Sequence, residues 1–410
     1  MTASFAASPV VSVVASLCAA SAVLAQTLHV YPRPSQTTSI TVRAVSNTGV
    51  VTGTYNQSPL DRFIYRWNPT QLDSPFSSVP SPNLAVSVAG IAAASGQTLL
   101  ANVPPLSSST WNGAAITSLP ALPAAYIPAQ PVSQRLRLAG LSADGSRVFG
   151  SYSHNDSMPP GLAYYSIPWT WSAATGYTQL PTPPADRPMP LGGPYGVLVN
   201  NSRNGQHAAG FASSTSIRSL PTIWSLGPLG WSYTTLPFPT DVPGTIVTDT
   251  FDFGHNTVSA ISDDGRIAIG SIRYRDGAND LLFLDVRWVD GVVTHTRLNG
   301  RITDNAQSAQ MTADGSLTLV DTMTNSPRIW NADGSTTSLR SYLESSGVTF
   351  PSDASIWSIA MSADGLTFAG LLTAPSQGWT TSRPWTVTIP SPATLPLLAF
   401  ALFATRRRRP

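Results

Sequence analysis

A single phrase recurs seven times along this chain and constrains its fold more than any other feature. The phrase consists of a small residue or two, a turn of the Ser-x-Asp-Gly kind, and an apolar run that usually ends in glycine. The turn glycines recur every 47 to 60 residues and are Gly49, Gly96, Gly145, Gly205, Gly265, Gly315 and Gly365. A period of this size is typical of a repeat architecture, in which one supersecondary unit is copied along the chain.

Each turn glycine is followed within 15 to 26 residues by a tryptophan. These repeat tryptophans are Trp67, Trp111, Trp171, Trp224, Trp288, Trp330 and Trp385. One unit therefore holds four short β-prone runs: one before the turn, one after it, one with the tryptophan, and one that ends near Leu-Pro. An Asx-Gly turn between two such runs favours a hairpin, because glycine adopts positive φ without steric cost.

Four strands in each unit of about 40–50 residues predict an all-β fold, a seven-bladed β-propeller with four-stranded antiparallel blades. The small residues of the first run suit the crowded innermost strand, and the repeat tryptophans suit the core between blades. The alternative for a tryptophan is an aromatic carbohydrate-binding surface. That role is better assigned to the four that fall outside the repeat register, Trp169, Trp231, Trp357 and Trp379.

The two ends of the repeat region predict how the ring closes. The last unit stops after its tryptophan run and lacks a fourth strand, whereas the β-prone segment Gln26–Arg33 belongs to no unit. We expect this N-terminal strand to join the last blade and close the ring, because full closure removes the open edges that invite aggregation.

Length and composition bound the remaining possibilities. A chain of 410 residues would ordinarily suggest two or three domains, but the repeat assigns residues 26–389 to one propeller. The single cysteine, Cys18, precedes the repeats, so the mature chain can form neither a disulfide nor a thiolate metal site. The formal charge of +2 includes Arg406–Arg409, and residues 26–389 carry 19 Arg against 21 acidic residues. This balance argues against nucleic-acid binding, which needs a basic patch on the folded domain.

Residues 1–25 are predicted to be a signal peptide. They carry no charge, contain an apolar stretch from Val10 to Ala25, and end in Val-Leu-Ala before Gln26, which fits cleavage by signal peptidase. The alternative is a buried N-terminal helix.

Residues 390–410 are predicted to be a sorting or anchor segment. They combine a Pro-x-Pro entry at Pro390–Pro392, an apolar stretch from Ala393 to Ala404, and Arg406–Arg409. The apolar stretch is short for a membrane span, which needs about 20 residues. We therefore expect a temporary membrane contact that is later cut; the alternative is an ordinary tail anchor.

Two resemblances follow from these patterns. The tail resembles the PEP-CTERM sorting signal of bacteria that make exopolysaccharide, which implies processing by an exosortase-type enzyme. Ser391 stands where glutamate is usual, which leaves the exact processing enzyme open. The repeats resemble the HAF-type extracellular repeats of bacteria, best at Gly140–Ser151, Ala260–Ser271 and Ala360–Leu371. That resemblance implies an exported, propeller-like domain and assigns no activity.

Catalytic motifs are missing from the sequence, which contains no GxSxG, HExxH or Walker loop and no placed Rossmann fingerprint. The five histidines have no metal-ligand spacing, so we expect neither a metal nor a cofactor. The aspartates of the repeats are predicted to accept hydrogen bonds from turn amides. The most site-like loops belong to a unit with extra residues, and their candidate catalytic residues are Asp252, His255, Asp276 and Asp280.

The sequence therefore favours an exported protein of the cell surface or extracellular matrix, a monomer that binds glycan or a surface protein without catalysis. Its expected processing partners are signal peptidase and an exosortase-type enzyme, and it would touch the membrane only through the tail before processing. The alternative is an extracellular hydrolase or lyase that acts on polysaccharide. Glycoside hydrolysis would need two carboxylates about 5–9.5 Å apart.

Overall fold

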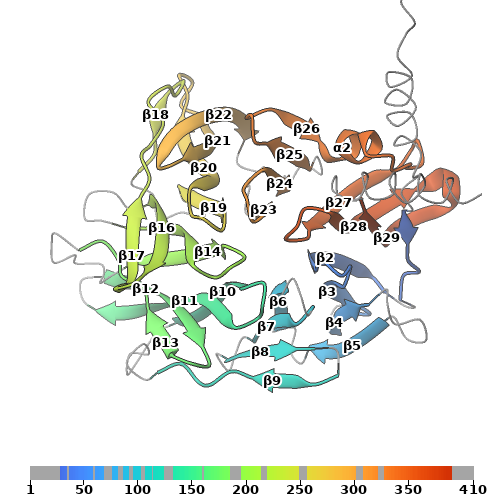
Figure 1. The fold of residues 1–410 in the computed structure, drawn as a ribbon, viewed down its shortest axis with the longest axis horizontal. Coiled ribbons are helices and arrows are strands. Elements are labelled where there is room, and N and C mark those ends of the chain that lie inside the picture. Colours follow the sequence, from blue (N-terminus) through green and yellow to red (C-terminus); the bar gives the residue numbers. More distant parts are fainter. Residues whose placement is uncertain are drawn as a thin grey trace, which may run out of the picture.

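The structure is a computed structural model of the chain. It describes residues 28–34, 37–58, 61–68, 76–81, 86–91, 96–102, 107–112, 114–123, 133–158, 161–184, 195–213, 219–248, 256–301, 308–321 and 327–389. The described strands form seven antiparallel sheets arranged in a ring, a seven-bladed β-propeller (Figure 1). The predicted fold class is confirmed.

The first four blades each contain four strands in sequence order from the centre outward. Blade 1 comprises β2 (Ser39–Val45), β3 (Val51–Asn56), β4 (Arg62–Trp67) and β5 (Phe76–Ser81). Blade 2 comprises β6 (Val86–Ile91), β7 (Thr98–Asn102), β8 (Ser107–Trp111) and β9 (Ile116–Ser118). Blade 3 comprises β10 (Ser133–Leu141), β11 (Arg147–Met158), β12 (Gly161–Ser172) and β13 (Gly176–Gln179). Blade 4 comprises β14 (Gly196–Asn201), β15 (His207–Ala212), β16 (Leu220–Gly227) and β17 (Gly230–Thr235).

The last three blades carry additions to this plan. Blade 5 comprises β19 (Thr257–Ile261), β20 (Ile267–Arg275), β21 (Leu281–Val289) and β22 (Val292–Arg301), with β18 (Thr245–Ile246) also paired to β20. Blade 6 comprises β23 (Ser308–Met311), β24 (Leu317–Asp321), β25 (Arg328–Asn331) and β26 (Thr336–Ser338), followed by α2 (Leu339–Ser345). Blade 7 comprises β27 (Ser355–Met361), β28 (Thr367–Ala374) and β29 (Trp379–Thr388), with the short helix η4 (Pro375–Gln377) before β29.

The N-terminal strand closes the ring, as predicted. Strand β1 (His29–Val30) pairs antiparallel with β29, with His29 opposite Thr386 and Val30 opposite Trp385, so it supplies the missing fourth strand of blade 7 (Figure 1). The Tyr31 hydroxyl adds a 2.6 Å hydrogen bond to the Thr386 hydroxyl. The two ends of the repeat region therefore share one sheet.

Two positions of the repeat require glycine for different structural reasons, as blade 5 shows. Gly265 in the turn has a φ of +71°, a left-handed conformation that a side chain would strain. Gly270 lies on β20 opposite a shift in register between Val258 and Ala260. A Cβ added there would lie 1.9 Å from the carbonyl oxygen of Thr257. The glycine that ends the apolar run therefore makes room for a bulge in the innermost strand.

The predicted core between blades is confirmed at six of the seven repeat tryptophans. The buried ones are Trp67, Trp111, Trp224, Trp288, Trp330 and Trp385. Two of them, Trp224 and Trp288, also donate their indole N–H groups to the carbonyls of Pro181 at 2.6 Å and Pro237 at 2.8 Å. The buried indole N–H groups of Trp67, Trp330 and Trp385 make no such bond within the described residues. Each proline follows the last strand of the preceding blade, so at these two boundaries the Leu-Pro that ends one unit binds the tryptophan of the next.

Blade 3 departs from the sequence prediction. Trp169, which was assigned to the surface, is completely buried, whereas Trp171 is only half-buried. Trp169 lies opposite Gly150, and a Cβ on that glycine would come within 2.5 Å of the indole ring. The two tryptophans share a face because they are two residues apart on one strand, and the space above the glycine admits Trp169.

The predicted signal peptide at 1–25 and the predicted sorting segment at 390–410 lie outside the described residues. Of the closing segment 26–33, the structure describes residues 28–33. Within the part of the chain that the structure describes, no helix combines the length and apolar character needed to cross a membrane.

Candidate functional site

The candidate catalytic residues do not form a site among the described residues. Asp276 and Asp280 lie at the exposed tip between β20 and β21, where Asp276 Oδ1 accepts the backbone N–H groups of Ala278 at 3.0 Å and Asp280 at 2.8 Å. The Asp276 carboxylate thus stabilises its own turn. Asp252 and His255 lie outside the described residues.

The repeat aspartates stabilise the turns, as the sequence predicts. In blade 3, Asp144 accepts hydrogen bonds from the Ser142 hydroxyl at 2.6 Å and from the backbone N–H of Ser146 at 3.0 Å. These bonds, that from the Ser142 hydroxyl above all, lower the pKa of Asp144. Among the described residues, no group of three or more His, Cys, Asp or Glu side chains could hold a metal ion.

The repeat turns also bind one another around the propeller axis. The N–H of Ala143 donates to the carbonyl of Arg203 at 2.6 Å, and the N–H of Asp263 donates to that of Ala313 at 2.7 Å. The backbone N–H of Asn204 donates to the Asp263 carboxylate at 2.9 Å. These contacts join blade 3 to blade 4, blade 4 to blade 5, and blade 5 to blade 6.

Polar side chains of blade 4 extend into this central region. The Asn200 amide donates to the carbonyls of Ser259 and Ala309, both at 2.8 Å, and so reaches blades 5 and 6. Burial lowers the pKa of Arg203. The negative charges of Asp263 on blade 5 and Asp364 on blade 7 act in the opposite direction and raise it. The charges of these two carboxylates therefore both act on Arg203. Since Asp263 and Asp364 also accept hydrogen bonds in the repeat turns, we assign them to ring structure.

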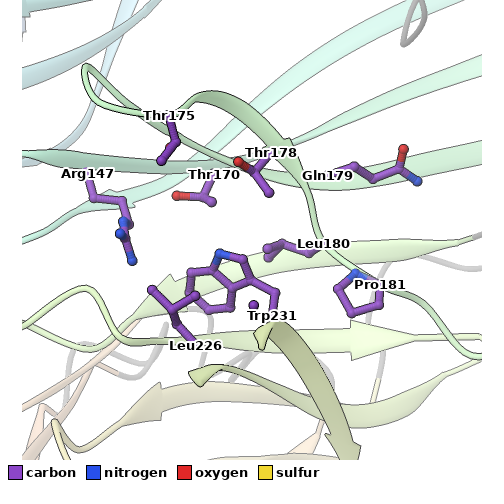
Figure 2. Close-up of a pocket in the computed structure, with 10 residues that line it drawn as sticks. Arg147, Thr170, Thr175, Thr178, Gln179, Leu180, Pro181, Leu226 and Trp231 are labelled. Atoms are coloured by element: carbon purple, nitrogen blue, oxygen red, sulfur yellow. The ribbon is translucent and has the colours of Figure 1, made fainter. Parts of the chain in front are cut away.

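A pocket of about 540 Å³ lies at the rim, between blades 3 and 4. Its described lining residues are Arg147, Thr170, Thr175, Thr178, Gln179, Leu180, Pro181, Leu226, Gly230 and Trp231. Figure 2 shows Trp231 and Leu226 on one side, Thr170 and Thr178 on the other, and Arg147 at one end. The volume falls within the range of about 300–1,000 Å³ that small-molecule sites occupy.

The pocket exists because the outer hairpin of blade 4 is long. Beyond the pair Trp224–Tyr233, strands β16 and β17 continue for three more pairs, including Leu226 opposite Trp231. The corresponding hairpin of blade 5 ends one pair after Trp288, at Val289 opposite Val292. The extra length carries Trp231 past the core and over the edge of blade 3.

Trp231 is half-buried and held by contacts from blade 3. The Arg147 guanidinium carbon lies 5.7 Å from the centre of the Trp231 ring, which is the geometry of a cation–π contact. The Phe149 ring meets the indole edge-on, with centroids 6.0 Å apart and an interplanar angle of 86°. Arg147 is itself fixed by a 2.9 Å hydrogen bond from Nη1 to the carbonyl of Gly205. The aromatic surface is therefore ordered before any ligand arrives.

The opposite wall supplies hydrogen-bonding groups. Thr170 lines the wall but is almost completely buried, and its hydroxyl donates to the carbonyl of Val148 at 3.1 Å. Neither the Thr178 hydroxyl nor the Gln179 amide makes a side-chain hydrogen bond within the described chain. An apolar floor that faces free hydroxyl and amide groups suits a ligand that has one apolar face and several polar substituents.

Only one signal in the sequence points to this pocket, namely the position of Trp231 outside the repeat register. Arg147, Thr170 and Thr178 carry no such signal, because each is an ordinary residue of its strand. Trp357 and Trp379 share the unusual register and are half-buried, but neither lines this pocket. Arg383 lies over the Trp379 ring at 5.6 Å, so an arginine–tryptophan pair alone does not distinguish the site.

No family model and no curated protein matches this chain. Solved structures similar to it include the β-propeller domain of Myceliophteria thermophila Cps50 (Swd1), at 10% identity and a TM-score of 0.45 over 89% of this chain and 100% of that one. Chaetomium thermophilum Raptor is also 10% identical, with a TM-score of 0.46 over 90% of this chain and 29% of its own length. The chain thus spans less than a third of Raptor. The propeller fold supports a binding or structural scaffold in general terms.

Proposed function

We propose that this protein is a non-enzymatic glycan-binding propeller that is exported and held at the cell surface or in the exopolysaccharide matrix. The proposed localisation rests on two segments of the sequence, the signal-peptide pattern of residues 1–25 and the tail at 390–410. The tail resembles a PEP-CTERM signal and would be cut by an exosortase-type enzyme. Its binding role rests on the rim pocket between blades 3 and 4.

The single observation that carries the proposal is the composition of that pocket. Its floor is the half-buried face of Trp231, and its other wall carries Thr170, Thr178 and Gln179. A sugar ring has an apolar C–H face that can cover an indole, while its hydroxyl groups need donors and acceptors around the edge. None of the ten described lining residues is an aspartate or a glutamate, so these residues offer no carboxylate pair for hydrolysis.

Binding of oligosaccharides to the purified full-length protein tests the proposal. We expect Trp231→Ala to weaken binding at least about tenfold, because one stacking partner accounts for much of the contact in a pocket of this kind. Trp379→Ala is the matched control, since Trp379 is also half-buried beneath an arginine but lies on blade 7, away from the pocket.

Two outcomes would contradict the proposal. One is the absence of oligosaccharide binding across a broad glycan array. The other is binding that Trp231→Ala leaves unchanged while both variants keep the wild-type melting temperature. Turnover of polysaccharide that depends on Asp252 and Asp276 would favour the hydrolase or lyase alternative instead.

A further inference from the structure

The rim pocket carries an uneven charge. Arg147 is the one charged residue among the ten described residues that line it. The acidic residue nearest to it in sequence, Asp144, is bound by the hydroxyl groups of Ser142 and Ser146 within the same turn. The pocket therefore has a positive end although residues 26–389 carry more acidic than basic side chains.

The guanidinium of Arg147 keeps most of its hydrogen-bonding capacity. Of its five N–H donors, the described structure uses one, in the bond from Nη1 to the carbonyl of Gly205 at 2.9 Å. That bond and the Trp231 ring fix the side chain, so little rotamer entropy is lost when a ligand binds. A planar guanidinium with free donors matches a carboxylate, which it can bind through two parallel hydrogen bonds.

The position of Arg147 relative to Trp231 sets where such a carboxylate would lie. Figure 2 shows Arg147 at one end of the indole, with Thr170 beside it and Thr178 farther along the same wall. A ring that covers Trp231 can therefore direct one substituent toward Arg147 and others toward Thr178 and Gln179. A hexuronate has this layout, because its carboxylate projects from a ring carbon and its hydroxyl groups project from the others.

We infer that the rim pocket selects a carboxylated sugar, a uronate residue of an acidic polysaccharide, with Arg147 pairing to the carboxylate and Trp231 supporting the ring. This inference rests on the proposed glycan-binding function and adds the class of glycan to it. Arg147 is the specificity-determining residue, and Trp231 supports charged and neutral rings alike.

The test compares two oligosaccharides of equal length, an oligogalacturonate and its carboxyl-reduced, neutral counterpart. Binding of each to the full-length protein is measured by calorimetry at low and high salt. We expect the wild type to prefer the oligogalacturonate at least about tenfold, since a hydrogen bond to a charged group contributes more than a neutral one. The preference should shrink at high salt because the pair is partly exposed to solvent.

Variants separate the two parts of the inference. Arg147→Gln should remove the preference by weakening binding of the oligogalacturonate more than binding of the neutral oligosaccharide, whereas Trp231→Ala should weaken binding of both to a similar extent. Arg147→Lys keeps the charge and should retain part of the preference. Arg383→Gln is the matched control, because it removes an arginine from over Trp379 and should change neither affinity.

The possible failures are distinguishable. Equal wild-type affinity for the two oligosaccharides, or a preference that survives Arg147→Gln, overturns the inference and leaves glycan binding standing. Absence of binding to both overturns the proposed function together with the inference. Binding of poly-aspartate at least as tight as that of the oligogalacturonate also overturns the inference, because it would show an acidic peptide to be the better ligand.

Discussion

The boundary between blades 3 and 4 and the boundary between blades 4 and 5 share the same core but differ at the rim. In each core, a buried tryptophan donates its indole N–H to the proline carbonyl at the end of the preceding blade, Trp224 to Pro181 and Trp288 to Pro237. Both tryptophans fill the space between neighbouring blades, because a single sheet cannot bury its own faces. The cores are therefore alike.

The rims differ in the length of the outer hairpin and at one repeat position, two residues after the turn glycine. At the first boundary this position is Arg147, which extends over Gly205 toward Trp231 and leaves a pocket. At the second boundary it is His207. Its ring covers Gly265 so closely that a Cβ on that glycine would lie 2.5 Å from the ring. The Nδ1 atom of His207 pairs with the Ser225 hydroxyl at 2.9 Å. The rim can thus vary in chemistry without disturbing the core beneath it.

The largest effect should come from the two cores. We expect Trp224→Ala and Trp288→Ala each to lower the free energy of unfolding by about 3–5 kcal/mol, because each removes a large buried side chain and its bond to a proline carbonyl. Denaturant unfolding measures both. A loss below about 1 kcal/mol in one variant alone would show that the two cores are not equivalent.

A smaller effect on stability should follow from making the rims alike. Replacing residues 226–231 by Asp-Gly would give blade 4 the short hairpin turn that blade 5 has at Asp290–Gly291. We expect a loss of only about 1 kcal/mol, since Trp231 is half-buried, together with loss of oligosaccharide binding. Melting curves and calorimetry measure the two quantities. Retained binding would mean that the long hairpin does not form the site.

The smallest effect should be a pH dependence at the second boundary. Burial lowers the pKa of His207 below its ordinary value of 6.5, and Asp264 and Asp263 oppose this shift only in part. The unfolded chain therefore takes up the proton at a higher pH than the folded one. Stability from this group is complete above pH 6.5 and decreases as the pH falls toward the lowered pKa.

The variant His207→Gln should reduce this pH dependence because glutamine does not titrate. Melting temperatures between about pH 7.5 and pH 5.5, where histidine changes charge, measure the difference between wild type and variant. Identical slopes in the two proteins would exclude His207 as the titrating group. Arg147→Gln changes the same repeat position at the first boundary, so it is the matched control and should leave the slope unchanged.

The sequence determined the number of blades, their four-strand composition and the way the ring closes. These features follow from local chemistry: turn glycines with positive φ, strands bounded by proline and glycine, and an N-terminal strand that belongs to no other unit. The role of the turn aspartates followed for the same reason, because Asp144 binds groups only two residues away.

Only the tertiary structure decided which aromatic side chains are buried and where a ligand could bind. Trp169 and Trp171 lie on the same face of one strand, and the space above Gly150 selects the former for the core. The rim pocket combines Arg147 with Trp231, which belong to different blades and are brought together by packing and by the length of one hairpin. The residue pattern within one repeat cannot reveal such a contact, because the distance between side chains of neighbouring blades is set by how the blades pack.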